Sequence, residues 1–204
     1  MRQSSTEFSQ LLVKAGRGVG LPLGLAEDLI DPVIWLQTCG FPGEYDFYTA
    51  LSALDKGRTE ARFPDLLKRD EAISLDRESA VYLATAACDL LQLDWPEVGE
   101  EVFLPETESP RLVAAALAFS YRLLRREHFL RIVTSAEVFI SGPGGEITCV
   151  RKESEHRTPT GVDKGVIRLS AERSRFDDAG TVLVDREKEA RFNESCRLKG
   201  LCAS

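Results

Sequence analysis

The sequence contains few of the residues that build common metal and catalytic centres. Only two of its 204 residues are histidine, His128 and His156, and neither begins an HxxH or HExxH pattern. No CxxC pair occurs, and no GxSxG motif marks a serine nucleophile. We therefore expect neither a metal site nor a cofactor, and no catalytic residue can be assigned from motifs.

Long apolar runs and an excess of basic charge are also missing. No uninterrupted apolar run approaches the roughly 18–20 residues of a membrane-spanning helix, and the first ten residues lack the apolar core of a signal peptide. The net charge is −7, and an acidic chain repels nucleic-acid backbones. We expect a cytoplasmic protein with no membrane or nucleic-acid partner. The basic residues of 122–131 are interpreted as the solvated face and last turn of a helix.

The cysteines are odd in number and widely spaced, which favours free thiols in a reducing compartment. Cys149 could form a nucleophilic pair with His156 or, together with Asp163, part of a metal site. Isolated cysteines on strands are more often small core residues, and this is the interpretation that we favour. The five cysteines are Cys39, Cys88, Cys149, Cys196 and Cys202.

Apolar residues recur with a helical period through most of the first 126 residues. Asp31-Pro32 interrupts the second helical segment, which predicts a kink or a restart with Asp31 as the N-cap. Ser109-Pro110 is a suitable N-cap and first-turn pair for the last one. The predicted helices are 5–17, 22–36, 46–54, 78–91 and 110–126.

Beyond residue 130 the period changes to the alternation of strands rich in β-branched residues. The turn 142–145, Gly-Pro-Gly-Gly, predicts a hairpin, and Asp185 is expected to cap a closing helix that ends near residue 198. We predict an α+β fold with a helical N-terminal half, a mainly antiparallel sheet in the later part and a closing C-terminal helix. The predicted strands are 101–104, 130–132, 135–140, 147–150, 166–169 and 181–184. The chain is expected to be a single domain, 1–204, with 1–56 as a potential helical subdomain.

Residues 14–29, KAGRGVGLPLGLAEDL, thread four glycines between basic and acidic residues. A phosphate-binding loop would need a GxGxxG or GK[ST] pattern after a strand, and this segment has neither and follows a helix. A DNA-reading helix-turn-helix would need basic residues on its second helix, but none occurs between Gly18 and Asp55. The segment is therefore interpreted as a glycine-rich joint between two packed helices.

The charges of this joint have two interpretations. Lys14, Arg17, Glu27 and the free amides near Gly24 could bind a small carboxylate or phosphate. Alternatively, Glu27 pairs with Arg17 or Lys14 across the turn and fixes the angle between the helices, which is the interpretation that we favour.

The same segment, with Trp35-Leu36, resembles the opening of a bacterial group known as domain-of-unknown-function family 3726. The resemblance is strongest over residues 8–43, and Glu194–Gly200 faintly resembles a Ser-Arg-x-x-Gly ending in that family. The C-terminus otherwise departs from the family, as does Pro32. The resemblance implies no reaction, because the family has no established activity. The matching positions are Lys14, Arg17, Gly18, Gly20, Gly24, Leu25, Ala26, Glu27, Trp35 and Leu36.

Two functional hypotheses follow. The first is an uncharacterised, non-catalytic partner-binding or accessory module that acts through an apolar helical surface, with a homodimer as one form of such association. The alternative is a small-metabolite enzyme or binder that recognises an anionic ligand at the joint through Lys14, Arg17, Gly24 and Glu27. We favour the first because no nucleophile, metal or cofactor pattern stands out.

Overall fold

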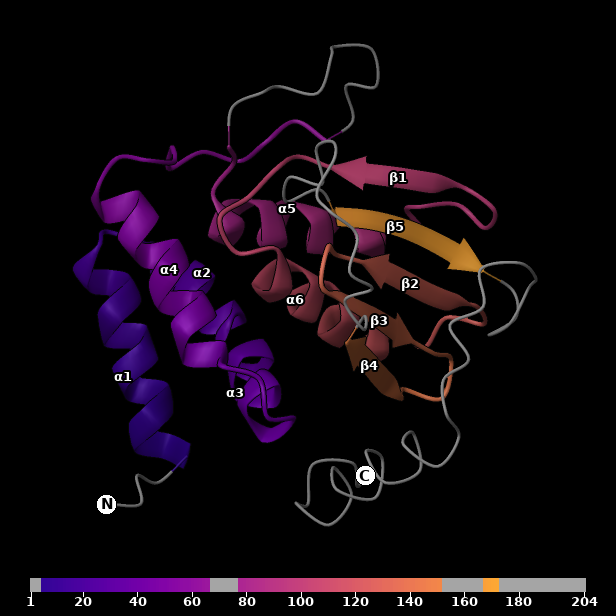
Figure 1. The fold of residues 1–204 in the computed structure, drawn as a ribbon, viewed down its shortest axis with the longest axis horizontal. Helices are drawn as coiled ribbons and strands as arrows, with labels where there is room; N and C mark the ends of the chain where they lie inside the picture. The colour runs from indigo at the N-terminus through magenta and orange to yellow at the C-terminus, as the bar shows by residue number, and fades with distance from the viewer. Residues whose placement is uncertain (1–4, 67–76, 152–166, 173–204) are drawn as a thin grey trace, which may run out of the picture.

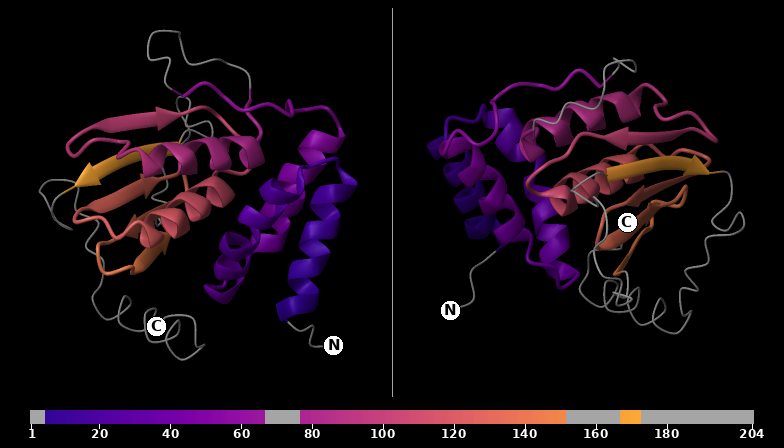
Figure 2. Two further views of the ribbon diagram at one scale, coloured as in Figure 1. Left: turned by 180° about the vertical axis from the view of Figure 1, so that it is seen from behind. Right: turned by 45° about the horizontal axis from the view of Figure 1, so that its top comes forward.

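The computed structural model describes residues 5–66, 77–151 and 167–172. Four helices come first and stand together at one side of the molecule (Figure 1). Two further helices cover one face of an antiparallel sheet, which Figure 2 shows from behind. The predicted α+β class is confirmed. The helices are α1 (Ser5–Gly18), α2 (Leu23–Asp28), α3 (Ile30–Thr38), α4 (Gly43–Asp55), α5 (Ala80–Gln92) and α6 (Pro110–Leu123). The strands are β1 (Glu101–Leu104), β2 (Phe129–Val133), β3 (Glu137–Ser141), β4 (Ile147–Arg151) and β5 (Ile167–Glu172).

The break between α2 and α3 lies at Leu29, which ends one helix and caps the next. The predicted restart is confirmed, but the predicted cap is wrong, because Asp31 lies inside the first turn of α3. The reason is that Pro32 fits anywhere in a first turn, where its missing N–H costs no hydrogen bond. The helix can therefore begin two residues before the proline.

Helices α5 and α6 are rich in small apolar residues, which lets them pack closely against each other. Residues 112–118 of α6 are all buried, and four of these seven are alanine. The helix begins after Ser109 as predicted, but the Ser109 hydroxyl makes no capping hydrogen bond. It ends at Leu123, before the predicted end at Arg126, and Arg125 adopts a positive φ of 49° where the chain turns away.

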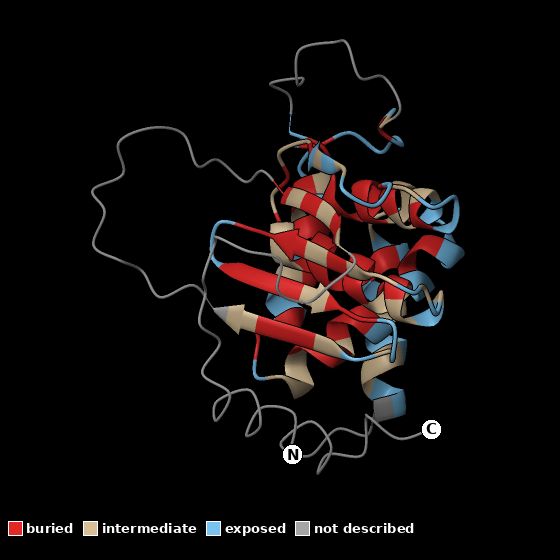
Figure 3. Ribbon diagram, turned by 90° about the vertical axis from the view of Figure 1, so that its right-hand side faces the viewer, coloured by how far each residue is buried: buried red, intermediate tan, exposed pale blue. Residues whose placement is uncertain are grey.

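The sheet has the strand order β1-β5-β2-β3-β4, and every pair is antiparallel. The predicted glycine-rich hairpin connects β3 to β4. Ile132 stands opposite Phe139 on one side and Leu169 on the other, and all three are fully buried. Buried residues run along these strands in Figure 3. Trp35 of α3 reaches this layer, with its ring centroid 6.1 Å from that of Phe139.

A group of buried charges, which we call the Arg111 junction, joins α4, α6 and β3. The Arg111 guanidinium lies 3.1 Å from Oδ2 of Asp46 and 2.7 Å from Oε1 of Glu137. Thr134 adds a hydrogen bond from its hydroxyl to Oε2 of Glu137 at 3.0 Å. The Glu137 side chain is 4% exposed, so these partners take the place of water around its carboxylate.

The predicted strand 181–184 and the predicted closing helix 185–198 lie outside the described residues. So do Cys196, Cys202, His156 and Asp163. The extent of the domain, 1–204 with a helical subdomain at 1–56, stays a prediction.

Candidate functional site

The glycine-rich joint connects α1 to α2 through a close helix contact. A Cβ atom added at Gly16 would lie 2.8 Å from Cβ of Ala26, so the two helices approach closely only because residue 16 has no side chain. Gly20, in the turn itself, has a φ of +85°, which glycine adopts without strain. These two positions explain the glycine pattern by packing and backbone geometry.

The charged residues of the joint are exposed and form no ion pair with one another within the described ranges. Lys14, Arg17, Gly24 and Glu27 are all exposed, and no ion pair found in the described part of the chain involves Lys14, Arg17 or Glu27. Glu27 lines a cavity to which Lys14, Arg17 and Gly24 do not contribute. The anion-binding role of these four residues stays a prediction.

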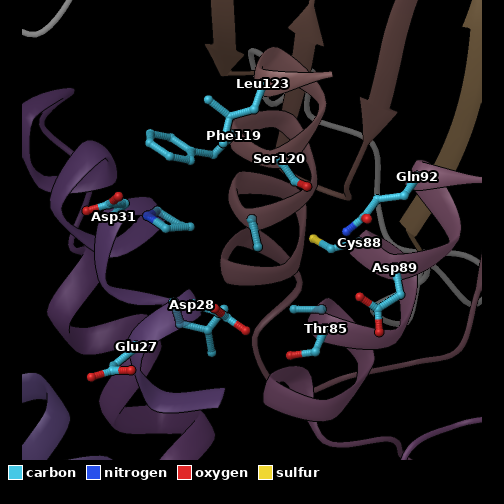
Figure 4. A pocket seen from close by; sticks show the side chains of 14 residues that line it. Glu27, Asp28, Asp31, Thr85, Cys88, Asp89, Gln92, Phe119, Ser120 and Leu123 are labelled. Atoms are coloured by element: carbon cyan, nitrogen blue, oxygen red, sulfur yellow. The ribbon is translucent and has the colours of Figure 1, made fainter. Parts of the chain in front are cut away.

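The cavity that includes Glu27 lies between the α2–α3 pair and the α5–α6 pair, and we call it the acidic groove (Figure 4). Its volume is about 360 Å³. This is within the range of about 300–1,000 Å³ that is usual for ligand pockets. Its walls are Glu27, Asp28, Leu29, Asp31, Pro32, Ala84, Thr85, Cys88, Asp89, Gln92, Ala116, Phe119, Ser120 and Leu123.

Carboxylates stand on both walls of the acidic groove. Glu27, Asp28 and Asp31 come from α2 and α3, and Asp89 comes from α5. In Figure 4, Asp28 and Asp89 project from opposite walls. All four carboxylates are exposed to solvent, and none of them takes part in an ion pair within the described ranges. None of the residues that line the groove is Lys, Arg or His. The lining of the groove therefore carries negative charge and contributes no cation of its own.

The rest of the lining is largely apolar. Ala84 and Ala116 face the cavity from α5 and α6, and their small side chains leave volume that larger residues would fill. Phe119 and Leu123 continue this surface along α6, and Leu123 is 66% exposed. The groove thus combines an apolar floor with acidic edges.

Cys88 is the one thiol in the groove, and it is poorly suited to act as a nucleophile. Burial raises its pKa to about 12, the charges of Asp89 and Asp28 act in the same direction, and a hydrogen bond with Ser120 lowers it in part. A thiol with this pKa is protonated near neutrality, whereas reactive cysteines have lowered pKa values. Thr85 is engaged too, because its hydroxyl donates to the carbonyl of Val81 at 3.1 Å.

Two basic residues at the end of α6 and just after it, Arg122 and Arg126, have structural partners. Arg126 donates to the carbonyls of Leu91 and Gln92 at the end of α5, at 3.2 and 3.1 Å, and pairs with Asp94. Arg122 stacks on Phe119, with 4.2 Å between Cζ and the ring centroid. These contacts cap α5 and cover an aromatic ring. Only Arg122 lies in the last turn of α6, so the predicted placement of the whole cluster on one helix is wrong, because α6 ends at Leu123 and Arg131 lies on β2.

The Cys149 pair and metal site considered from the sequence are tested only in part, because His156 and Asp163 lie outside the described residues. Cys149 is buried on β4, and Cys39, Cys88 and Cys149 form no disulfide. Within the described ranges, no three His, Cys, Asp or Glu side chains are grouped as metal ligands. None of the described helices combines the length and the apolar character needed to cross a bilayer.

The acidic groove was not predicted from the sequence, although one of its two walls can be recognised there. Glu27, Asp28 and Asp31 fall in a stretch, residues 18–55, that contains no basic residue. This lack of basic residues excludes a DNA-reading helix, and it also marks the α2–α3 wall as acidic. The opposite wall could not have been found in this way, because Asp89 approaches α2 only through the tertiary packing of α5.

Fold and groove together define an α+β protein with an open, acidic cleft between its helical layers. Residues 3–76 match the family model described as Protein of unknown function (DUF3726), which confirms the resemblance seen in the sequence. The matched region contains α1–α4 and thus one wall of the groove, whereas α5, α6 and the sheet lie beyond it. Searches of curated proteins and of solved structures gave no match.

Proposed function

We propose that this chain is a cytoplasmic, non-catalytic partner-binding or accessory module that docks its partner in the acidic groove. The observation that carries the proposal is an apolar floor edged by four carboxylates. Within the described ranges these carboxylates form no ion pair, and no cation stands among the residues that line the groove. Such a surface suits a binding partner. A partner that carries both apolar and basic groups can cover the apolar area and pair with the carboxylates at the same time.

The chemistry of the lining favours binding over catalysis. The Cys88 thiol is protonated near neutral pH, and the Thr85 hydroxyl is hydrogen-bonded within its own helix. No histidine lines the groove, so the lining offers no imidazole to activate the Cys88 thiol or the Thr85 hydroxyl. The carboxylates are exposed, so they stay hydrated until a partner arrives and cost the folded chain little.

Selection of binders from a random-peptide display library tests this proposal. Peptides selected on the wild-type chain are titrated against Leu123→Ser, which removes apolar surface from the groove. Leu93→Ser is the matched control, because Leu93 is 74% exposed and does not line the groove. We expect about tenfold weaker binding to Leu123→Ser, equivalent to about 1.4 kcal/mol, and unchanged binding to the control.

Thermal unfolding of both variants shows whether they remain folded. Binders that tolerate Leu123→Ser as well as Leu93→Ser would place the docking surface elsewhere. Failure to select any binder would contradict the proposal, and a concentration-dependent mass in light scattering would instead indicate self-association.

The exposure of Lys14 and Arg17 favours a second candidate, the binding of a small carboxylate or phosphate at the glycine-rich joint. A thermal-shift screen of such anions tests it on the wild type and on Arg17→Ala, with the exposed Arg58→Ala as the charge-matched control. Gly24→Ala should fold well, because a Cβ atom there meets nothing within 4 Å. Stabilisation that needs Arg17 but not Arg58 would support this function.

A further inference from the structure

We infer that the occupant of the acidic groove is a positively charged amphipathic helix of another protein. This inference rests on the proposed function and names the partner of the same site. It follows from the volume of the groove, the nature of its walls and the distribution of charge around it.

The volume indicates what enters the groove. A cavity of about 360 Å³ holds about a dozen water molecules at ~30 Å³ each, which is far less than a complete helix occupies. It can accept a few apolar side chains that project from one face of a partner. The rest of the partner then lies across the opening, beside the exposed Leu123 and the acidic edges.

The walls indicate the secondary structure of the partner. All lining residues belong to α2, α3, α5 and α6 or to the single residue between α2 and α3, so the groove contains no strand edge. A strand docked there would find no ladder for its backbone N–H and C=O groups, whereas a helix satisfies these groups internally. An amphipathic helix presents apolar anchors at i, i+3 or i+4, and i+7, which is how helices bind to grooves between helices.

The charges indicate the sign of the partner and its orientation. Three carboxylates stand on the α2–α3 wall and one on α5, while Arg122 covers Phe119 on the α6 side. Lysine or arginine residues of the partner therefore belong opposite Asp28, Asp31 and Asp89, and not above α6. A second copy of this chain is a poor occupant, because its net charge of −7 is of the same sign as the groove.

Defined peptides of about 18 residues, five helical turns, test the inference with fluorescence anisotropy. The probe is a leucine–lysine peptide with its leucines on one helical face. Its two comparisons are a leucine–glutamate peptide with the same pattern and a leucine–lysine peptide of scrambled order. We expect the patterned basic peptide to bind at least about tenfold more tightly than either.

Variants of the chain show whether the groove is the binding site. Asp28→Asn with Asp31→Asn removes two charges from the groove, and Asp55→Asn with Glu127→Gln removes two exposed charges elsewhere. We expect the first pair to weaken binding of the patterned basic peptide about tenfold or more, and the second pair to change it less than about twofold. Raising the salt concentration from about 0.05 M to about 0.3 M should reduce the difference between the pairs.

Each contrary result has a distinct meaning. Equal binding of the scrambled peptide would overturn the amphipathic helix, and equal sensitivity to both pairs of variants would overturn the groove as the source of charge recognition. Display-selected peptides that need Leu123 but carry no basic residue would overturn this inference and leave the proposed function intact. If no selected peptide needs Leu123, the proposed function fails first.

Discussion

The Arg111 junction and the acidic groove are two places where the first helices meet the rest of the molecule through carboxylates, and the two differ in whether those carboxylates have a cation beside them. At the junction, one guanidinium serves two largely buried carboxylates, Asp46 and Glu137. In the groove, four exposed carboxylates face no cation among the lining residues. The chain supplies a counter-charge where burial would make an unpaired carboxylate costly, and it supplies none where water can hydrate the charge. The unpaired group is therefore the one available to a partner.

The largest expected effect is a loss of stability when the counter-charge at the junction is removed. Arg111→Met should destabilise the protein by about 3–5 kcal/mol, because the largely buried Glu137 and Asp46 carboxylates would lose the cation that pairs with both of them. Urea unfolding followed by circular dichroism measures this change. The exposed Arg58→Met is the matched control, and it should change stability by no more than ~0.5 kcal/mol. Equal effects of the two substitutions would show that the ion pairs of Arg111 do not contribute more to stability than an exposed arginine does.

A smaller effect is expected from placing a cation in the groove, which makes the groove resemble the junction. Gln92→Arg brings a guanidinium within one helical turn of Asp89, at the C-terminal end of α5. We expect at most about 1 kcal/mol of stabilisation, since exposed pairs contribute little, but about tenfold weaker binding of the patterned basic peptide. Leu93→Arg adds the same charge next to the groove without lining it, and its binding should match that of the wild type. Equal binding of the peptide by Gln92→Arg and Leu93→Arg would contradict the view that the groove binds a partner because it lacks a cation.

The junction should also give the stability a pH dependence. Burial raises the pKa of Asp46 above its ordinary value of 3.8, and the neighbouring Glu137 and Glu44 charges add to this, although Arg111 opposes it. Below that value Asp46 is protonated in both states. As the pH rises, the unfolded chain ionises first, so stability is lost until the pH passes the folded-state pKa. Asp46→Asn lacks this loss, so its stability relative to the wild type should rise with pH from about 3.8 until the pH passes the folded-state pKa of Asp46. Urea unfolding across this range measures the trend, and a difference that shrinks with pH would contradict it.

The smallest expected effect belongs to the groove carboxylates. Asp28→Asn combined with Asp31→Asn should change the free energy of unfolding by no more than ~0.5 kcal/mol, because both side chains are exposed and unpaired within the described ranges. Thermal unfolding at low and moderate salt measures it. A decrease of several kcal/mol in the free energy of unfolding would mean that these carboxylates stabilise the packing of the helices. It would contradict the view that they are available to bind a partner.

Residue patterns along the chain predicted the elements better than their ends. β1 begins and ends where it was predicted, at Glu101–Leu104, as a short strand within a loop-like segment. The start of α3 was misplaced because several positions in a first turn accept a proline. α6 ends early because Arg126 is engaged by the end of α5, a contact that no local pattern shows.

The candidate site was predictable only in part, for a related reason. The acidic wall of α2 and α3 is continuous in sequence, and its lack of basic residues can be read directly. The opposite wall and the Arg111 junction join positions far apart along the chain, as with Arg111 and Asp46, which are 65 residues apart. Whether a charge has a partner is decided by tertiary packing, so it could not be read from the charges themselves.

The position of β5 bears on the order in which the protein can be completed. This strand comes last among the described strands, yet it lies between β1 and β2 in the sheet. Until residues 167–172 are in place, β1 has no neighbour and β2 has a bare edge, and such edges are where chains pair wrongly. A nascent or truncated chain that ends before residue 167 would therefore be a source of aggregation. Pairing across such long separations also favours slow folding, so the sheet is expected to close late in synthesis.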